Sequence, residues 1–265
     1  KNDENESAFT QIKTGASIAW PLFSKYFEVF GGVEVGGRFY TSSHGYDHTW
    51  DRVSFGARHY GKNDKKTFLV SFRSTDIVGD LGDRQRYHDE GNVGFYWEFK
   101  NTKNSTIKLF VKGGDSNYQI YNTHVFSVNY GRQGIETTYL SPGKRKSTLS
   151  AMYVTGEDYE QECDFPPCPA AYGRKVRGLQ LSWGVNIFDS SRLYSSLYFE
   201  NSDYHKQFFF QNRKDLRSEL FMGIDTHLGK SWYFRPEIHY TENQSNLAVY
   251  EHDRWLFNMR LGWKL

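Results

Sequence analysis

The sequence predicts an all-β fold, a transmembrane antiparallel up-and-down β-barrel of about fourteen strands, on three observations. Apolar and polar residues alternate with a period of two in segment after segment, as in half-buried strands. The segments last about 9 to 11 residues, which is the length that a tilted strand needs to cross a bilayer. Aromatic residues make up 18% of the chain and gather near segment ends, where a barrel has its interfacial girdles.

The alternation is clearest in the final segment, WLFNMRLGWKL at residues 255–265, where every second side chain is apolar up to the last residue. LRSELFMGIDTHL, WYFRPEIHY, LQLSWGVNI and FEVFGGVEVGGRF follow the same rule, and no segment sustains a helical period. Polar turns or loops separate the segments, which predicts a meander in one domain, residues 1–265. The predicted strands start near residues 11, 26, 49, 67, 91, 104, 119, 134, 146, 174, 191, 216, 231 and 247.

Alternation alone does not tell which face meets water, and a soluble β-sandwich with an aromatic core is the alternative. About fourteen strands in one ring would leave an interior too wide for side chains to fill, and a charged interior can hold water. We therefore expect the apolar face to contact lipid and the last strand to pair with the first, because an open edge in lipid is not tolerated. The expected girdle residues are Trp20, Tyr40, Trp50, Tyr60, Trp232 and Trp255.

The charge balance and the hydropathy exclude several other classes of protein. The 33 Lys and Arg nearly balance the 31 Asp and Glu, so no basic field favours a nucleic-acid partner. No apolar run approaches the length of about 18 residues that a transmembrane helix requires. No signal peptide is visible, and we interpret the KNDENES start as a mature or trimmed N-terminus.

The two cysteines, Cys163 and Cys168, lie five positions apart in ECDFPPC. Two thiols without a nearby histidine make only half of a zinc site. A local disulfide in a long loop is the preferred interpretation, and it implies an oxidising compartment. The sequence predicts no metal and no cofactor.

The polar positions of the alternating segments form the predicted lumen lining. Both charge signs occur on neighbouring strands, so facing pairs would shape the field inside a pore. They either keep the lining wet and stiff or select cargo and ions. The predicted lumen residues are Glu28, Glu34, Arg38, Arg217, Glu219, Asp225, His227, Arg235, Glu237, His239 and Arg260.

One polar loop, SSHGYDH, holds Ser42, Ser43, His44, Asp47 and His48. A Ser/His/Asp set is the combination used in hydrolytic triads, and the two histidines with the aspartate could bind a metal. A plain polar turn is the preferred interpretation because all five residues lie in one loop. We therefore expect no enzymatic activity.

The last fifty or so residues contain an Arg-x-Asp motif, then a Tyr-Thr-x-Asn-x-Ser-Asn loop, then a Tyr-x-x-Asp-Arg motif that leads into the final strand. In this order they resemble the C-terminal barrel of the surface lipoprotein assembly modifier family, the outer-membrane component of the type XI secretion system. FYTSSHGYDHTWDRVSFGARHY and AAYGRKVRGLQLSWG are similar to other hairpins of these barrels. The resemblance is loose over most of the chain and closer over residues 210–265, and other barrels fused to helical repeats share the Ser-Asn loop. The loop-motif residues are Arg213, Asp215, Ser245, Asn246, Asp253 and Arg254.

The resemblance implies an outer-membrane translocator in a Gram-negative bacterium that exports a protein or surface lipoprotein from periplasm to cell surface. Its implied partners are outer-membrane lipid, the secreted or surface-anchored cargo, a periplasmic chaperone or helical-repeat domain, and the barrel-assembly machinery. Within the loop motif we expect Arg213 to pair with Asp215 and Asp253 with Arg254. A passive porin for small polar solutes is the alternative function, because mixed lumen charges suit it equally well.

Overall fold

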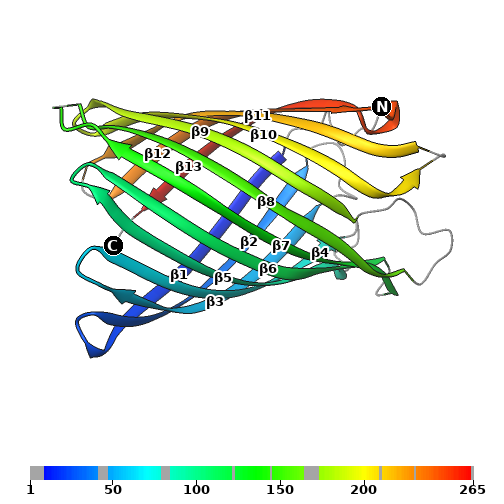
Figure 1. Cartoon of the computed structure of the whole chain (residues 1–265), viewed down its shortest axis with the longest axis horizontal. Coiled ribbons are helices and arrows are strands. Elements are labelled where there is room, and N and C mark those ends of the chain that lie inside the picture. The colour runs from blue at the N-terminus through cyan, green and yellow to red at the C-terminus, as the bar shows by residue number, and fades with distance from the viewer. Residues whose placement is uncertain are drawn as a thin grey trace. The chain divides into compact units, whose positions relative to one another are not determined.

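The computed structural model describes residues 9–40, 47–78, 84–120, 123–143, 145–163, 173–208, 211–229 and 231–263. These residues form a sheet of thirteen antiparallel strands whose order follows the chain (Figure 1). The strands are β1 (Phe9–Ser24), β2 (Phe27–Tyr40), β3 (His48–Tyr60), β4 (Asp64–Val78), β5 (Arg84–Thr102), β6 (Ser105–Ile120), β7 (Thr123–Leu140), β8 (Ser147–Cys163), β9 (Arg174–Phe188), β10 (Ser191–Phe208), β11 (Gln211–Leu228), β12 (Trp232–Ser245) and β13 (His252–Trp263). A short 3-10 helix, η3 (Ala248–Tyr250), precedes β13, and no helix in the described ranges has the length and apolar character of a membrane span.

The predicted all-β antiparallel meander is confirmed, with one difference in the strand count. Two strands were expected to start near residues 119 and 134, and the structure has the single strand β7 there. Gly131, Arg132 and Gln133 interrupt the apolar alternation, but the backbone pairing continues through them because a ladder does not need apolar side chains. The strands have 12 to 19 residues, so they extend beyond the apolar runs that the sequence shows.

The chain divides into two compact units, and each is described by itself. The first unit comprises Lys1–Trp97, Phe110–Arg132 and Glu157–Gly173, and it contains β1 to β4 whole. The second comprises Glu98–Leu109, Gln133–Gly156 and Arg174–Leu265, and it contains β9 to β13. The closing pair between the first and last strands stays a prediction.

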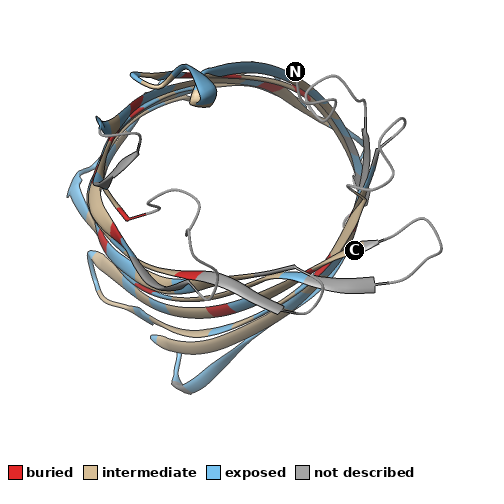
Figure 2. Ribbon diagram, turned by 90° about the vertical axis from the view of Figure 1, so that its right-hand side faces the viewer, coloured by how far each residue is buried: buried red, intermediate tan, exposed pale blue. Residues whose placement is uncertain are grey.

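Burial in this protein is the reverse of that in a soluble sandwich. Among the described residues, four apolar side chains are buried, namely Trp50, Phe110, Val154 and Val176. Ten polar or charged ones are buried, namely Ser71, Thr75, Ser127, Asp158, Glu200, Ser202, Asp215, Glu237, Thr241 and Asn243. Buried positions, red in Figure 2, are confined to short patches along the strands. Large apolar side chains are exposed instead, which requires an apolar surrounding phase.

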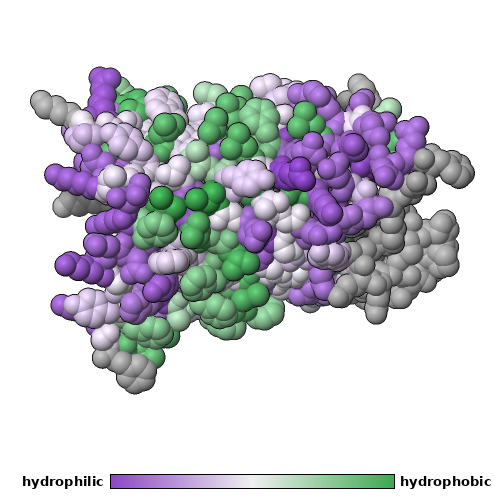
Figure 3. Space-filling model, viewed as in Figure 1, coloured by the Kyte–Doolittle hydropathy of each residue, from purple (hydrophilic) through white to green (hydrophobic). Residues whose placement is uncertain are grey.

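The exposed apolar residues occupy alternate positions and so share one face of each strand. On β9 these are Leu179, Leu181 and Trp183, each more than 40% exposed, and on β13 they include Phe257 and Met259. Figure 3 shows hydrophobic side chains gathered over the middle of the strands, with hydrophilic ones toward the strand ends. A membrane-spanning sheet has this distribution, since its apolar band is flanked by polar ends that meet water.

Candidate functional site

The face opposite to the exposed apolar residues is called the polar face below. In the second unit it brings together residues from four strands through their register. Ser202 on β10 lies opposite Asp215 on β11, which in turn lies opposite Ser245 on β12. The neighbouring row places Glu200 opposite Arg217. Polar side chains therefore form continuous rows across the strands.

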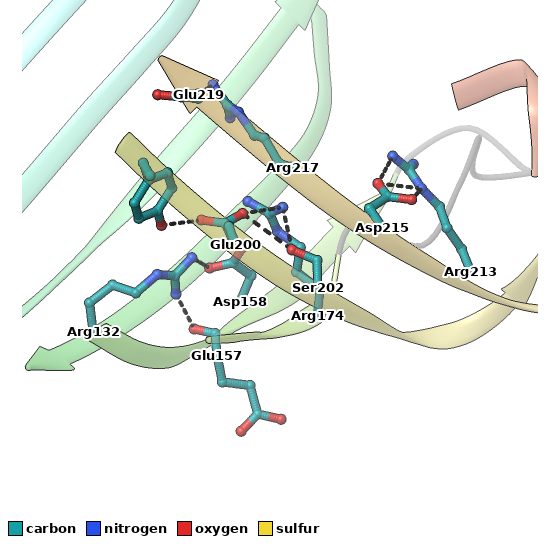
Figure 4. A network of polar contacts seen from close by, with 11 residues as sticks. Arg132, Glu157, Asp158, Arg174, Glu200, Ser202, Arg213, Asp215, Arg217 and Glu219 are labelled. Atoms are coloured by element: carbon teal, nitrogen blue, oxygen red, sulfur yellow. Dashed lines mark hydrogen bonds and ion pairs between the residues drawn. The ribbon is translucent and has the colours of Figure 1, made fainter. Parts of the chain in front are cut away.

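The row at Glu200 is held by charge-assisted hydrogen bonds. Arg174 on β9 donates from Nη1 to Glu200 Oε1 over 3.2 Å and to Ser202 Oγ over 3.0 Å (Figure 4). The second carboxylate oxygen of Glu200 accepts a 2.6 Å hydrogen bond from the Tyr198 hydroxyl. Glu200 is 9% exposed, so these bonds compensate a buried charge.

Predicted lumen residues of β11 and β12 pair with one another on the same face. Arg217 forms an ion pair with Glu219, whose Oε2 lies 3.5 Å from Nε2 of His239. Arg235 donates from Nη2 to Asp225 Oδ2 over 2.5 Å. In these contacts each cation lies beside an anion, so the local charges of this part of the polar face largely cancel.

Glu237 is buried and accepts a 2.8 Å hydrogen bond from the hydroxyl of Tyr194 on β10. The Tyr194 ring reaches Glu237 by lying across Gly223, its cross-strand partner on β11. A Cβ at Gly223 would lie 2.6 Å from Cζ of Tyr194, which is closer than any real contact. Glycine at this position therefore allows the tyrosine to lie flat against the wall.

Three loop-motif residues meet at the start of β11 and the end of β12. The Nε of Arg213 donates to both carboxylate oxygens of Asp215, at 3.0 Å each. The Arg213 guanidinium also lies over two rings, 4.2 Å from the Tyr204 centroid and 3.4 Å from that of Tyr250. Ser245 on β12 is the cross-strand partner of Asp215 and interacts with its carboxylate. We call Arg213, Asp215, Tyr204, Tyr250 and Ser245 the Arg213 clasp.

Asn246 attaches the following loop to β11 through its side-chain amide. Its Oδ1 accepts from Lys214 N at 2.7 Å, and its Nδ2 donates to Asn212 O at 2.9 Å. The amide thus supplies one donor and one acceptor, as a strand residue does. From β12, Asn243 Nδ2 donates to Tyr250 O over 2.8 Å at the other end of the loop. The base of the 246–251 loop is consequently well anchored.

In the first unit, the polar face has a similar set of pairs. Glu28 forms an ion pair with Arg58 and accepts a 3.1 Å hydrogen bond from the Tyr60 hydroxyl. Glu34 accepts from Lys13 Nζ and from Trp50 Nε1, both at 3.3 Å. Two predicted lumen residues, Glu28 and Glu34, thus have partners on neighbouring strands that the alternation pattern does not indicate.

Figure 4 also shows Arg132 on β7, which reaches β8 at two points. Its Nη2 lies 2.5 Å from the buried Asp158 Oδ1, and its Nη1 donates to the Glu157 carbonyl over 3.1 Å. This arginine lies in the stretch where the apolar alternation fails, so its role was not predicted.

The girdle prediction is wrong for Trp50 and Tyr60. Trp50 is 8% exposed and hydrogen-bonds Glu34 on the polar face, while Tyr60 bonds Glu28 there. Side chains alternate between the two faces of β3, and the odd-numbered Val53 and Phe55 are exposed on the apolar face. The even-numbered Trp50 and Tyr60 therefore lie on the polar face. The other described girdle candidates, Trp20, Trp232 and Trp255, are exposed. The side chain of Tyr40 lies outside the described part.

The remaining predicted site residues lie on β2, β11 and β13. Arg38 lies opposite His48 in the β2–β3 register, and His227 is exposed near the end of β11. The backbone of Arg260 pairs with that of Arg235. Asp253 and Arg254 are exposed neighbours on β13, whose side chains point to opposite faces. The described contacts do not include the pair expected between them.

The SSHGYDH cluster falls largely outside the described residues, which include only Asp47 and His48 of its candidates. Within the described ranges, no three His, Cys, Asp or Glu side chains gather in a way that could hold a metal ion. Cys163 is the last residue of β8, and Cys168 lies outside the described residues. The disulfide stays a prediction.

If Cys163 and Cys168 are bridged, the intact mass of the non-reduced protein should be lower by two hydrogens than that of the reduced protein. Iodoacetamide should then modify the cysteines only after reduction. Alkylation of both thiols without a reductant would contradict the bridge and remove the argument for an oxidising compartment.

Several side chains that make contacts on the polar face were not predicted from the sequence. The alternation in WDRVSFGARHY could have indicated Arg52 and Arg58, because Val53 and Phe55 hold its apolar positions and residues of the other parity face the opposite way. The tyrosines of the polar face had no such signal, because aromatic residues were assigned to the girdles. The residues missed are Arg52, Arg58, Arg73, Tyr194, Tyr198 and Glu200.

Together, the long antiparallel strands, the exposed apolar face and the ion-paired polar face define an integral outer-membrane β-sheet protein. No protein-family model matches the chain, and no curated protein matches its sequence.

Several solved structures have a similar fold. The β domain of the Bordetella autotransporter BrkA is 12% identical, with 98% of this chain and 99% of that chain covered and a TM-score of 0.45. The translocator domain of the autotransporter NalP from Neisseria meningitidis is 11% identical, with 97% and 87% covered and a TM-score of 0.41. OmpT from Vibrio cholerae is 7% identical, with 96% of each chain covered and a TM-score of 0.49. At these identities and TM-scores, the functions of those proteins do not transfer to this chain.

Proposed function

We propose that this protein is an outer-membrane export pore that moves a protein or surface lipoprotein from periplasm to cell surface. The observation that carries the proposal is the Arg213 clasp. Arg213, Asp215 and Ser245 belong to the motif that resembles the surface lipoprotein assembly modifiers, and they make one connected set of contacts. Asn246, from the same motif, anchors the adjoining loop. Motif residues that contact one another in the structure support the proposal more strongly than sequence similarity alone.

The polar face gives the pore hypothesis its physical basis. Side chains such as Arg217, Glu219 and Arg235 are paired, and they line a surface that water can wet while the apolar face contacts lipid. In the proposed setting the partners are those that the resemblance implies, including a periplasmic delivery factor and the barrel-assembly machinery. A place in a type XI secretion system of a Gram-negative bacterium is part of the proposal.

A passive porin for small polar solutes is the second candidate. The observation that favours it is the local charge balance of the described pairs, Arg217 with Glu219 and Arg235 with Asp225. Such a lining would be mildly selective and would not need a client protein.

Single-channel conductance of the refolded protein in a planar lipid bilayer tests the proposal. A protein that inserts but stays closed, or opens briefly only at high voltage, would support a gated translocator. Steady, large, ohmic openings would contradict the export proposal and favour the porin.

A double substitution, Arg217→Ala with Arg235→Ala, separates the two functions further. In a translocator it should reduce surface display of the cargo more than it changes conductance, whereas in a porin it should shift the reversal potential in a salt gradient. Lys214→Ala is the matched control, because Lys214 is an exposed cation on the other face of β11. Equal effects of the double substitution and the control would contradict a role for the polar face.

A further inference from the structure

Two arginines face each other on the polar face of the first unit. Arg52 on β3 and Arg73 on β4 are direct cross-strand partners. Both point away from the apolar face, since their sequence neighbours Val53 and Phe72 are 46% and 54% exposed. Like charges directly opposite each other on antiparallel strands are destabilising. An anion bound between the two arginines would therefore reduce their mutual repulsion.

The nearby carboxylates make their contacts with other residues. Glu34 is the cross-strand partner of Arg52, but its Oε2 lies 3.3 Å from Lys13 Nζ and its Oε1 accepts from Trp50. Glu90 accepts a 3.2 Å hydrogen bond from the Tyr130 hydroxyl. Glu34 and Glu90 attract Arg73 at longer range and Glu34 also attracts Arg52, while Arg52 and Arg38 repel Arg73. No hydrogen bond or ion pair joins Arg52 or Arg73 to any described residue.

The Arg73 side chain is held in place by packing. Its guanidinium carbon lies 5.2 Å from the ring centroid of Trp50, which is buried and hydrogen-bonded to Glu34. Trp50 packs closely against Gly36, where a Cβ would overlap its ring. The Nε of Arg73 is buried and has no acceptor, which is costly for a charged donor. Packing therefore fixes the position of the Arg73 side chain before any ligand binds, and its Nε–H remains an unpaired donor.

We propose that Arg52 and Arg73 form a binding site for an oxyanion, a phosphate or a carboxylate. A guanidinium presents a planar fork of donors that matches the two oxygens of such a group. An oxyanion between the two forks would satisfy the buried donor and neutralise the facing charges. The ligand is either free inorganic phosphate or an acidic side chain of a passing polypeptide. The second source rests on the proposed export function, whereas the anion site itself does not.

Calorimetric titration of the refolded protein in detergent micelles tests the site. The probes are inorganic phosphate and a hexa-aspartate peptide, and the key variant is Arg52→Gln with Arg73→Gln. We expect this variant to lose at least tenfold in affinity for the probe that binds the unmodified protein, since charge-assisted hydrogen bonds from both forks are removed. Arg58→Gln is the matched control, because Arg58 lies on the same strand and face but is paired with Glu28.

Each outcome decides the proposal or the source of the ligand. Binding of phosphate that is lost in the double variant and kept in Arg58→Gln supports a small-anion site. Binding of hexa-aspartate alone with the same variant pattern supports a site for acidic polypeptide. Binding of neither probe, or an equal loss in Arg58→Gln, overturns the site. Because binding in micelles requires no transport, a failure here is distinct from a failure of cargo export.

Folding of each variant is checked by heat-modifiable migration on a gel. If the double glutamine variant does not fold, Arg52→Lys with Arg73→Lys replaces it. Lysine keeps the charge and removes the planar fork, so this variant should bind the probe more weakly than the unmodified protein. Unchanged affinity would overturn recognition by the guanidinium forks.

Discussion

Replacing Leu181 by Arg is expected to destabilise the protein in lipid by about 2–4 kcal/mol, the cost of a cation at the middle of a barrel's lipid face. Leu181 is the eighth residue of the fifteen in β9, and its side chain is 43% exposed on the apolar face. Arginine at this depth must hold its charge in hydrocarbon or distort the bilayer around it. This substitution therefore tests directly which face of the sheet meets lipid.

The matched control is Gln180→Arg, one residue away at nearly the same depth. Gln180 lies on the polar face and donates to Ser196 Oγ over 2.8 Å. Its Nε2 also donates to Ser182 Oγ over 3.2 Å, so its replacement should cost about 1–2 kcal/mol for the two lost hydrogen bonds. Denaturant unfolding in lipid vesicles measures both variants. If Gln180→Arg proved as costly as Leu181→Arg, the assignment of the two faces would be wrong.

Asp215→Ala is the second substitution with a large expected effect, about 3–5 kcal/mol, as for breaking a buried ion pair. The side chains of Arg213 and Asp215 are 14% and 5% exposed. Removing the carboxylate leaves the half-buried Arg213 guanidinium without its anion. The two tyrosine rings over Arg213 cannot replace a bidentate carboxylate, since a cation–π contact contributes only about 0.5–2 kcal/mol.

Asp253→Ala is the control for this substitution, because Asp253 is an exposed acid on β13, two strands away. We expect it to change the free energy of unfolding by less than about 0.5 kcal/mol. Replacing the pair together, Arg213→Met with Asp215→Leu, should recover much of the loss because no buried charge remains. Similar values for Asp215→Ala and Asp253→Ala would show that the clasp does not stabilise the fold.

The faces of the strands could be predicted because alternation is a local property. In β11, Leu216 and Met222 are exposed as expected, while Glu219 and Asp225 take part in ion pairs on the other face. The pair Arg213 with Asp215 was also predicted, as a loop contact, and the structure forms it on one face of β11, where the two residues lie two positions apart.

The partners of most polar residues could not be predicted, because they depend on register between strands. Tyr194 meets Glu237 across β11 only because Gly223 leaves room between them. The same limit explains the error at Trp50, whose polar-face role depends on Glu34 of β2. Composition assigns such aromatic residues to lipid, and only strand phase and pairing correct it.

The scarcity of buried apolar side chains has a thermodynamic consequence. A soluble domain unfolds with a large increase in heat capacity, because its apolar core becomes hydrated. Here four apolar side chains are buried among the described residues, while many more lie exposed on the strands. The phase that keeps them from water is the hydrocarbon of the host membrane. The energetics of the native state consequently belong to protein and bilayer together, and they change with hydrocarbon thickness.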